Sequence, residues 1–438
     1  MKNAFKLLLD RRFLLLAGLL LLLFGWLGSR GSVDFPVYYR SAQNFFFHHG
    51  PVYGPHSGLG WPMYYRYPPL FLFLFYPLLK LPLTWAAGLW GAGKAFVLFW
   101  IVRQLCYVWG ARCQHLNGLA QASSWLRQHW RRLLIPLLIS GTYILVELRY
   151  GNVQFYIFGL TAAGLFWMRR HPLRASIALG LAISLKVWPL FFVPFFWVRD
   201  ARKQAAGALL AAAGLTLLPG VFWNWHGNLA LLAEWGRQEW TTAVQVAKIW
   251  YPSQSLRGIM TRYLTAAAIP GYPRVAIAHW PAARVRAAWI ALECLGYAAW
   301  LKLAIRPSVP AMGPDGESEE RWQDILLAAV GWGWLALLAP FTHIEDLCIL
   351  LWPACVAGEL LQRRFAPGSS GRLIWAAALL AGIIPLIPGR MAQRWLQAAG
   401  ADFLVVVLLT LALSSIAWRA QARAAAVRKN SMMTSIPR

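Results

Sequence analysis

Charged residues are scarce in this chain of 438 residues, where they make up 13% of the total against about 25% in an average soluble domain. Acidic side chains are scarcer still, since 16 Asp and Glu face 42 Lys and Arg and leave a net charge of +26. Hydrophobic residues supply 59% of the chain, and the mean hydropathy is +0.48. A soluble globular protein would need more polar surface, and a disordered chain would hold far fewer apolar side chains. The composition therefore predicts a polytopic membrane protein.

Cysteines and metal-binding patterns are also lacking. The five cysteines are too few for a disulfide scaffold. The histidines His48, His49 and His56 have no metal-ligand spacing with nearby carboxylates, so we expect no metal site. The cations and aromatic residues form no known nucleic-acid reader motif, and we expect no nucleic-acid partner. We attribute the positive charge to cytoplasmic loops and, in part, to contact with anionic membrane lipids.

Hydrophobic runs recur along the whole chain and are separated by basic loops. Because cytoplasmic loops collect Lys and Arg, both termini are expected inside. We predict an all-α polytopic bundle with about twelve membrane-spanning helices, two of them half-spans that meet near Lys186. The Pro-flanked run 68–77 is too short to cross, which indicates an interfacial or re-entrant helix after the first outer loop. The expected spans are 13–28, 85–107, 133–146, 155–168, two within 175–198, 205–222, 287–304, 325–341, 347–361, 374–387 and 403–417.

The chain is expected to form one integral membrane domain over residues 1–438. Its expected parts outside the spans are a first external loop with interfacial helices at 29–84, a long Trp-rich external segment at 223–285, a cytoplasmic linker at 306–323, and a basic cytoplasmic tail at 419–438. No internal sequence repeat is visible, which argues against the repeat-based architecture that is usual in secondary transporters.

Polar residues concentrate at the outer ends of the expected spans. Charged groups in or beside membrane segments cost free energy, so each is a candidate functional residue. The candidates are Asp34, Tyr38, Arg66 and Tyr67 in the first loop, Asn152 and Gln154 at an outer turn, Lys186 between the half-spans, Gln254, Ser255 and Arg257 in the long external segment, and His343, Glu345 and Asp346 at a later helix mouth. Their shared side predicts a site at the membrane–water boundary.

Structural roles also suit these residues. Asp34 suits the N-cap of a helix, and Lys186 could extend its amine to the interface. Gln254 and Ser255 could form hydrogen bonds within a loop, and the acidic pair 345–346 could form structural ion pairs. The tryptophans suit an aromatic belt at the membrane surface.

A series of motifs occurs in order between residues 34 and 353. They are Asp34-Phe35-x-Val37-Tyr38-Tyr39, Tyr67-Pro68-Pro69-Leu70, Gly180-Leu181-Ala182 followed by Lys186-x-x-Pro189-Leu190, and Gln254-Ser255-Leu256. This series resembles glycosyltransferase family 87, and the resemblance implies a GT-C-like helical bundle. The sequence departs from the family pattern at 151–154, where Gly-Asn-Val-Gln replaces Gly-Gln-x-Asn, and at 339–346, where the histidine and acidic positions are shuffled. A donor sugar or an acceptor other than the usual one is consistent with these departures.

The resemblance implies a hexosyltransferase that moves a hexose, typically mannose, from a polyprenyl-phosphate donor to a glycolipid or glycan hydroxyl. It implies Asp34 as the general base, with Lys186 and Arg257 available to neutralise the departing phosphate, and inversion at the sugar carbon. The lipid-linked donor is a co-substrate, and no other cofactor is expected. The location implied is the cytoplasmic (inner) membrane, with the active site on the external or periplasmic face.

Two other functions stay open. One is a transporter or flippase of lipid-linked sugars, which would place polar residues near the middle of the bilayer and show pseudo-symmetric halves. The other is a transferase of another GT-C branch.

The first testable prediction concerns topology. Reporter fusions at Trp225 and Gly316 should report opposite sides of the membrane, with Trp225 outside, because the intervening segment contains one expected span. If both fusions report the same side, the crossing pattern is wrong.

Overall fold

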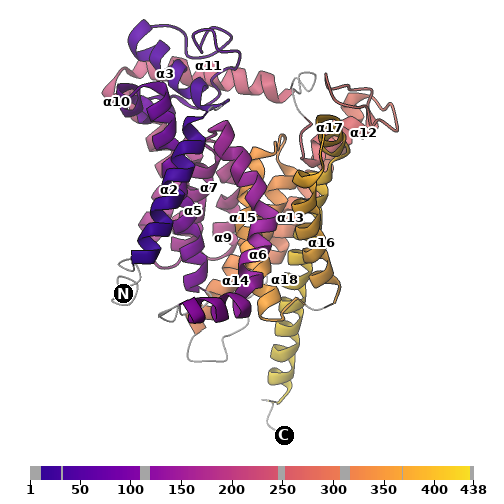
Figure 1. The fold of residues 1–438 in the computed structure, drawn as a ribbon. Helices are drawn as coiled ribbons and strands as arrows, with labels where there is room; N and C mark the ends of the chain where they lie inside the picture. The colour runs from indigo at the N-terminus through magenta and orange to yellow at the C-terminus, as the bar shows by residue number, and fades with distance from the viewer. Residues whose placement is uncertain are drawn as a thin grey trace. The chain divides into compact units, whose positions relative to one another are not determined.

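The computed structural model describes residues 11–30, 33–108, 119–244, 252–305, 316–366 and 368–434, and in these ranges the regular secondary structure is helical (Figure 1). The chain divides into two compact units. Unit 1 contains Met1–Arg103, Ile144–Val193 and Ala201–Lys248, and unit 2 contains Gln104–Tyr143, Pro194–Asp200 and Ile249–Arg438.

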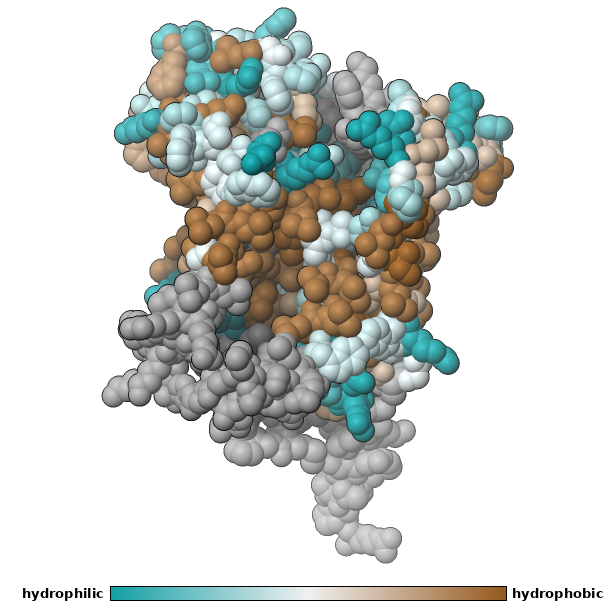
Figure 2. Space-filling view, in the orientation of Figure 1, coloured by the Kyte–Doolittle hydropathy of each residue, from teal (hydrophilic) through white to brown (hydrophobic). Residues whose placement is uncertain are grey.

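Unit 1 is built from helices of very different lengths. They are α2 (Arg11–Ser29), α3 (Phe35–His48), α4 (Pro69–Phe75), η1 (Tyr76–Lys80), most of α5 (Leu83–Val108), the end of α6 (Leu119–Tyr150), α7 (Gln154–Trp167), α8 (Pro172–Leu185), η2 (Trp188–Phe192), α10 (Arg202–Phe222) and α11 (Trp225–Val244). Within this unit, α3 and α11 lie at the end opposite to the start of α2 (Figure 1). Hydrophilic side chains gather over that end, whereas hydrophobic side chains gather over the adjoining helices (Figure 2).

Unit 2 contains most of α6, nearly all of α9 (Val193–Val198) and the helices in the second half of the chain that follow α11. The latter are α12 (Leu256–Leu264), α13 (Ala282–Ile305), α14 (Gly316–Leu338), η3 (Glu345–Leu350), α15 (Leu351–Gln362), α16 (Ser369–Ile383), η4 (Ile384–Leu386), α17 (Arg390–Ala399) and α18 (Ala401–Thr434). Helices α12 and α17 lie together at the end of this unit opposite to the C-terminal end of α18 (Figure 1).

Six helices in the described ranges are long and apolar enough to cross a membrane, which agrees with a polytopic membrane protein. They are Leu83–Leu105, Trp130–Tyr150, Arg202–Phe222, Ala282–Ile305, Ser369–Leu386 and Ala401–Ala422. Shorter apolar helices occur at Gly18–Ser29, Pro69–Lys80, Gln154–Trp167, Pro172–Leu185 and Trp188–Val198. The total of about twelve crossings and the interfacial position of the helix at 69–80 stay predictions.

Helix boundaries follow the local sequence. The expected break near Lys186 is present: α8 ends at Leu185, Lys186 is extended, and η2 begins two residues later with Pro189 in its first turn. The boundaries differ at two polar segments, because α14 already starts at Gly316 and α18 continues to Thr434. Both segments are rich in Ala, Glu or Arg, which are good helix formers, so nothing there stops the helix.

Helix α2 packs closely against α5 because small residues face each other. A Cβ on Gly28 would lie 2.7 Å from the Ala87 carbonyl oxygen and 3.0 Å from the Cα of Gly91. Such small-residue contacts let two backbones approach, which is the usual source of helix association in membranes.

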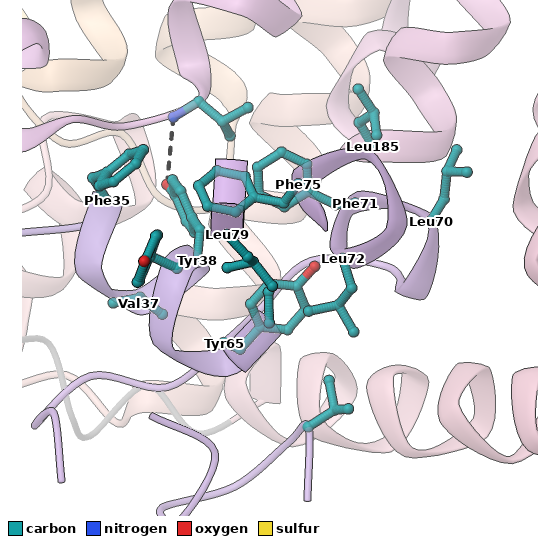
Figure 3. Close-up of a cluster of buried hydrophobic side chains, with 14 of the residues drawn as sticks. Phe35, Val37, Tyr38, Tyr65, Leu70, Phe71, Leu72, Phe75, Leu79 and Leu185 are labelled. Atoms are coloured by element: carbon teal, nitrogen blue, oxygen red, sulfur yellow. Dashed lines mark hydrogen bonds between the residues drawn. The ribbon is translucent and has the colours of Figure 1, made fainter. Parts of the chain in front are cut away.

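An aromatic core holds α3 and α4 in unit 1 (Figure 3). Tyr38 of α3 packs edge-to-face on Phe71 of α4 with ring centroids 5.1 Å apart, and Phe35 lies 5.3 Å from Phe75. All four side chains are buried, so the aromatic face of α4 that carries Phe71 and Phe75 packs against the protein rather than against lipid.

A buried ion pair joins α5, α6 and α7 in unit 1. Lys94 Nζ lies 2.9 and 2.8 Å from the two carboxylate oxygens of Glu147, and both side chains are excluded from solvent. Glu147 Oε1 also accepts a hydrogen bond of 3.2 Å from the Phe155 amide, in the first turn of α7. A carboxylate at this position also complements the positive end of the α7 dipole.

The second testable prediction concerns this pair. Lys94→Met should lower the free energy of unfolding by about 3–5 kcal/mol, because Glu147 would stay buried without its counter-ion. Lys94→Met combined with Glu147→Gln should recover much of that loss, since the amide oxygen can still accept from Phe155. Thermal unfolding in detergent measures both. Glu239→Gln, which breaks a partly exposed pair with Arg66, serves as the control with a change of at most about 1 kcal/mol. A double variant no more stable than Lys94→Met would contradict this assignment.

Candidate active site

Asp34 lies immediately before α3 and faces the turn between α6 and α7. Its amide donates to the Tyr150 carbonyl at 2.8 Å, and its Oδ2 accepts from Asn152 Nδ2 at 2.8 Å. The carboxylate makes no capping hydrogen bond to α3, and its residue is helical in conformation rather than extended as N-cap residues usually are. The side chain is therefore directed to Asn152 instead of the helix end.

The turn at 151–153 brings two amide side chains close together. Gly151 has a φ of +70°, which a residue without Cβ adopts at little cost, and its carbonyl accepts from Trp90 Nε1 at 3.0 Å. Asn152 Oδ1 accepts from the Gln154 amide at 3.0 Å, which leaves its Nδ2 for Asp34. Asn152 and Gln154 are both buried.

Lys186 joins this group from the break after α8. Its Nζ donates to Gln154 Oε1 at 2.9 Å, and Trp188 Nε1 donates to the same oxygen at 3.2 Å. Its side chain is partly buried and is held by a specific acceptor, so it does more than reach toward solvent.

Two tyrosines complete the group, which we call the Asp34 cluster: Asp34, Tyr38, Tyr67, Asn152, Gln154 and Lys186. The hydroxyls of Tyr38 and Tyr67 are 3.1 Å apart. The Val153 backbone amide donates to the Tyr38 hydroxyl at 3.3 Å, the bond drawn as a dashed line in Figure 3. Lys186 Nζ lies 5.9 Å from the centre of the Tyr67 ring. Burial, then Tyr67 and the charge of Asp34, raise the pKa of Tyr38 well above its ordinary value, so Tyr38 keeps its proton.

The Lys94–Glu147 pair supports this cluster, and sequence reasoning missed it. Glu147 is four residues before Gly151, whose amide bonds the Glu147 carbonyl at 3.0 Å, and its side chain holds the start of α7. The pair therefore fixes the turn on both sides, at the end of α6 and at the start of α7. The available signal was a single lysine inside the apolar run of α5.

Arg66, also a sequence candidate, binds α11. Its Nε and Nη2 donate to the two carboxylate oxygens of Glu239 at 3.0 and 2.8 Å. The neighbouring Gln238 donates to the Tyr65 carbonyl at 2.7 Å and accepts from the Gly54 amide at 2.9 Å. These bonds fasten α11 to the first loop, and a role for Arg66 in binding the donor stays a prediction.

In unit 2, the candidates Gln254 and Ser255 are buried and bonded to the protein. Gln254 Nε2 donates to the Gln397 carbonyl at 2.9 Å, and the Gln254 amide donates to the Thr342 carbonyl at 2.6 Å. Ser255 caps α12 by accepting from Gly258 at 3.2 Å. These contacts favour the structural role for both side chains, and contact with a substrate stays a prediction.

Arg257 lies between two aromatic rings of unit 2. Its guanidinium carbon is 5.0 Å from the centre of the Trp289 ring and 5.1 Å from that of Phe341. Burial and then the charge of Arg286 lower its pKa, while Glu293 opposes the shift. Arginine stays protonated in proteins, so the guanidinium still carries its charge. Its contact with a donor phosphate stays a prediction.

The later candidates form a local turn in unit 2. The His343 amide donates to Asp346 Oδ2 at 2.9 Å, and His343 Nδ1 lies 3.4 Å from Glu345 Oε1, an ion pair when the imidazole is protonated. Among the described residues, no three His, Cys, Asp or Glu side chains gather as a possible metal site.

Comparison with known proteins adds an independent line of argument. The family model for glycosyltransferase family 87 matches residues 65–313, more than half of the chain. This range contains Tyr67, the turn at 151–154, Lys186 and Arg257, whereas Asp34 and His343 lie outside it.

One relative is the polyprenol-phosphate-mannose-dependent alpha-(1-2)-phosphatidylinositol mannoside mannosyltransferase of Mycobacterium tuberculosis (strain ATCC 25618 / H37Rv), 30% identical over 174 residues. The match covers 38% of this chain and only 40% of the relative. No solved structure matches. Because the family model covers more than half of its length, the chain belongs to glycosyltransferase family 87.

Proposed function

We propose that the protein is a hexosyltransferase that moves a hexose, with mannose as the first candidate, from a polyprenyl-phosphate donor to the hydroxyl of a glycolipid or glycan. The family supports glycosyl transfer, and the relative's name supports a polyprenol-phosphate-mannose donor. The observation that carries the proposal is the Asp34 cluster, in which a carboxylate and an ammonium group are bound to the same short turn.

The proposed chemistry is a direct displacement at the sugar carbon C1. The acceptor oxygen attacks C1 as Asp34 takes its proton, and the bond from C1 to the phosphate oxygen breaks, so polyprenyl phosphate leaves with the electron pair. Asn152 orients the carboxylate through its bond to Oδ2. A single displacement inverts the configuration, so a β-linked donor would yield an α-glycoside. General base catalysis of this kind accelerates a reaction by about 10²–10⁴-fold.

Lys186 is the cation that we assign to the departing phosphate. Its ammonium group is held by Gln154 and lies beside the Tyr67 ring, so it is positioned before a donor arrives. A fixed charge that meets developing negative charge stabilises a transition state without reorganisation. The donor carries one phosphate rather than a diphosphate, so the proposed reaction needs no metal ion or other cofactor.

We place the reaction at the external or periplasmic face of the cytoplasmic membrane. The distribution of basic loops supports this orientation, since it puts the Asp34 cluster on the side opposite to both termini. The polyprenyl chain of the donor would then stay in lipid while its phosphate reaches Lys186.

The third testable prediction concerns catalysis by Asp34. Purified protein should transfer radiolabel from polyprenyl-phosphate mannose to an acceptor, and Asp34→Asn should lower kcat about 10²-fold or more. Asparagine can still accept from Asn152 but cannot take a proton, so thermal stability and donor affinity should stay near wild type.

Glu234→Gln, at an exposed acid of α11, is the matched control and should keep full activity. Wild-type turnover in Asp34→Asn would remove Asp34 as the base and move the assignment to Glu345 or Asp346. Failure of the wild type to use any polyprenyl-phosphate sugar would overturn the proposed function itself.

The fourth testable prediction concerns the phosphate. Lys186→Ala should raise the KM for the donor about tenfold, because a charged hydrogen bond is lost, and Lys186→Arg should retain part of the affinity. Gln154→Glu keeps an acceptor for Lys186 but places a negative charge beside the ammonium group, so this substitution should also weaken donor binding. The readout is KM for the donor with the acceptor saturating. Unchanged donor affinity in Lys186→Ala would show that the amine does not bind the donor phosphate.

A further inference from the structure

Four arginine or lysine side chains are at least nine-tenths buried among the described residues. Three of them have a carboxylate near: Lys94 has Glu147 at 2.8 Å, Arg199 has Asp324 at 2.7 Å, and Arg257 has Glu293, whose charge acts on its pKa. The fourth is Arg262 of α12, in unit 2, with 5% of its surface exposed. A buried charge without a counter-ion is strongly unfavourable, so Arg262 needs a separate explanation.

The contacts of Arg262 leave one nitrogen without a partner. Its Nε donates to the Ala398 carbonyl at 3.0 Å and its Nη1 to the Ser253 carbonyl at 2.6 Å, whereas Nη2 is buried without a hydrogen bond. In the described part of the chain no carboxylate pairs with this guanidinium. Burial lowers the pKa of Arg262 to about 10, so the group is still charged at neutral pH.

Arg262 lines a small recess near α12 and α17. The volume is about 10 Å³, room for one water-sized group. Its lining includes Arg262, Tyr272, Arg274 and Ala398. Arg274 is exposed, so a second guanidinium borders the recess on its solvent side.

The segments that contain the lining residues carry only positive charge, and the next acid beyond them in sequence is the buried Asp402, whose Oδ1 accepts from Tyr143 at 3.0 Å. Residues 252–281 and 384–399 contain no Asp or Glu, and their arginines are Arg257, Arg262, Arg274, Arg390 and Arg394. Arg394 of α17 stacks on Tyr272, a lining residue, with its guanidinium carbon 5.7 Å from the ring centre. The electrostatic potential here therefore favours an anion over a neutral ligand.

We propose that this recess binds a phosphate group, with one phosphate oxygen accepting from Arg262 Nη2 and others reaching Arg274. A phosphate suits the site better than a carboxylate, because it has more oxygens. When one phosphate oxygen occupies the recess beside Arg262, others remain to accept from the exposed guanidinium of Arg274. A lipid headgroup and free phosphate present the same chemistry. None of the lining residues belongs to the Asp34 cluster, and the proposal does not depend on the proposed transfer reaction.

The fifth testable prediction uses the full chain purified in a maltoside detergent, which contains no phosphate. Calorimetric titration would use inorganic phosphate, dihexanoyl phosphatidylinositol, and dihexanoylglycerol as the phosphate-free probe. We expect saturable binding of a phosphate-bearing probe and none of dihexanoylglycerol. Binding of the lipid alone identifies a headgroup site, whereas binding of both identifies a general phosphate site.

Variants locate the site. Arg262→Lys should weaken binding at least about tenfold, because lysine lacks the planar fork that reaches two carbonyls and a ligand together. Arg274→Gln should weaken it several-fold and is the safer variant, since this exposed side chain makes no bond that holds α12. Arg284→Gln, at an exposed arginine in α13, is the matched control and should bind as wild type does. If neither phosphate probe binds, or if Arg274→Gln binds as tightly as wild type, the recess holds only water and the proposal is overturned.

Discussion

The Lys94–Glu147 pair is the contact on which the arrangement of unit 1 depends most. It lies where three helices meet, and its carboxylate is shared between an ammonium group and the first turn of α7. In a dry interior, neither charge tolerates the loss of the other, so α5, α6 and α7 are held at fixed spacing. The turn at 151–153 lies directly after this contact in the chain. The positions of Asn152 and Gln154 therefore depend on the Lys94–Glu147 pair, although neither member of that pair is a candidate substrate-binding residue.

Unit 2 also contains buried charges that are paired, at Arg199 and at Glu359. Arg199 meets Asp324 and also the Ala304 carbonyl, and the buried Glu359 pairs with Arg132 and Arg363. The Arg199–Asp324 and Arg132–Glu359 pairs link segments distant in sequence, so they restrict which helix faces can meet. Apolar contacts alone would be less selective, because lipid tails and leucine side chains are similarly apolar.

Much of this organisation could be predicted from the sequence. The low charge content indicated a helical membrane protein, and Pro189 with basic residues on both flanks indicated a break near Lys186. The Lys94–Glu147 pair could not be found in this way, because its members are 53 positions apart and each looks like an isolated charge. Gln254 shows the opposite limit. Its polarity marked it as a candidate, but only the fold shows that its donors bond the carbonyls of Pro252 and Gln397.

The short turn at 151–153 has a consequence for how the specificity of this protein can change. The carboxylate of Asp34 is bonded to Asn152 and the amine of Lys186 to Gln154, two positions further along the chain. The turn therefore sets the distance between the proposed proton acceptor and the proposed phosphate-binding cation. A shift in the turn moves both groups at once, which in the proposed reaction couples reactivity to donor affinity. In that reaction, adaptation to a different sugar is easiest at residues outside the turn, which can vary without changing the spacing between the two groups.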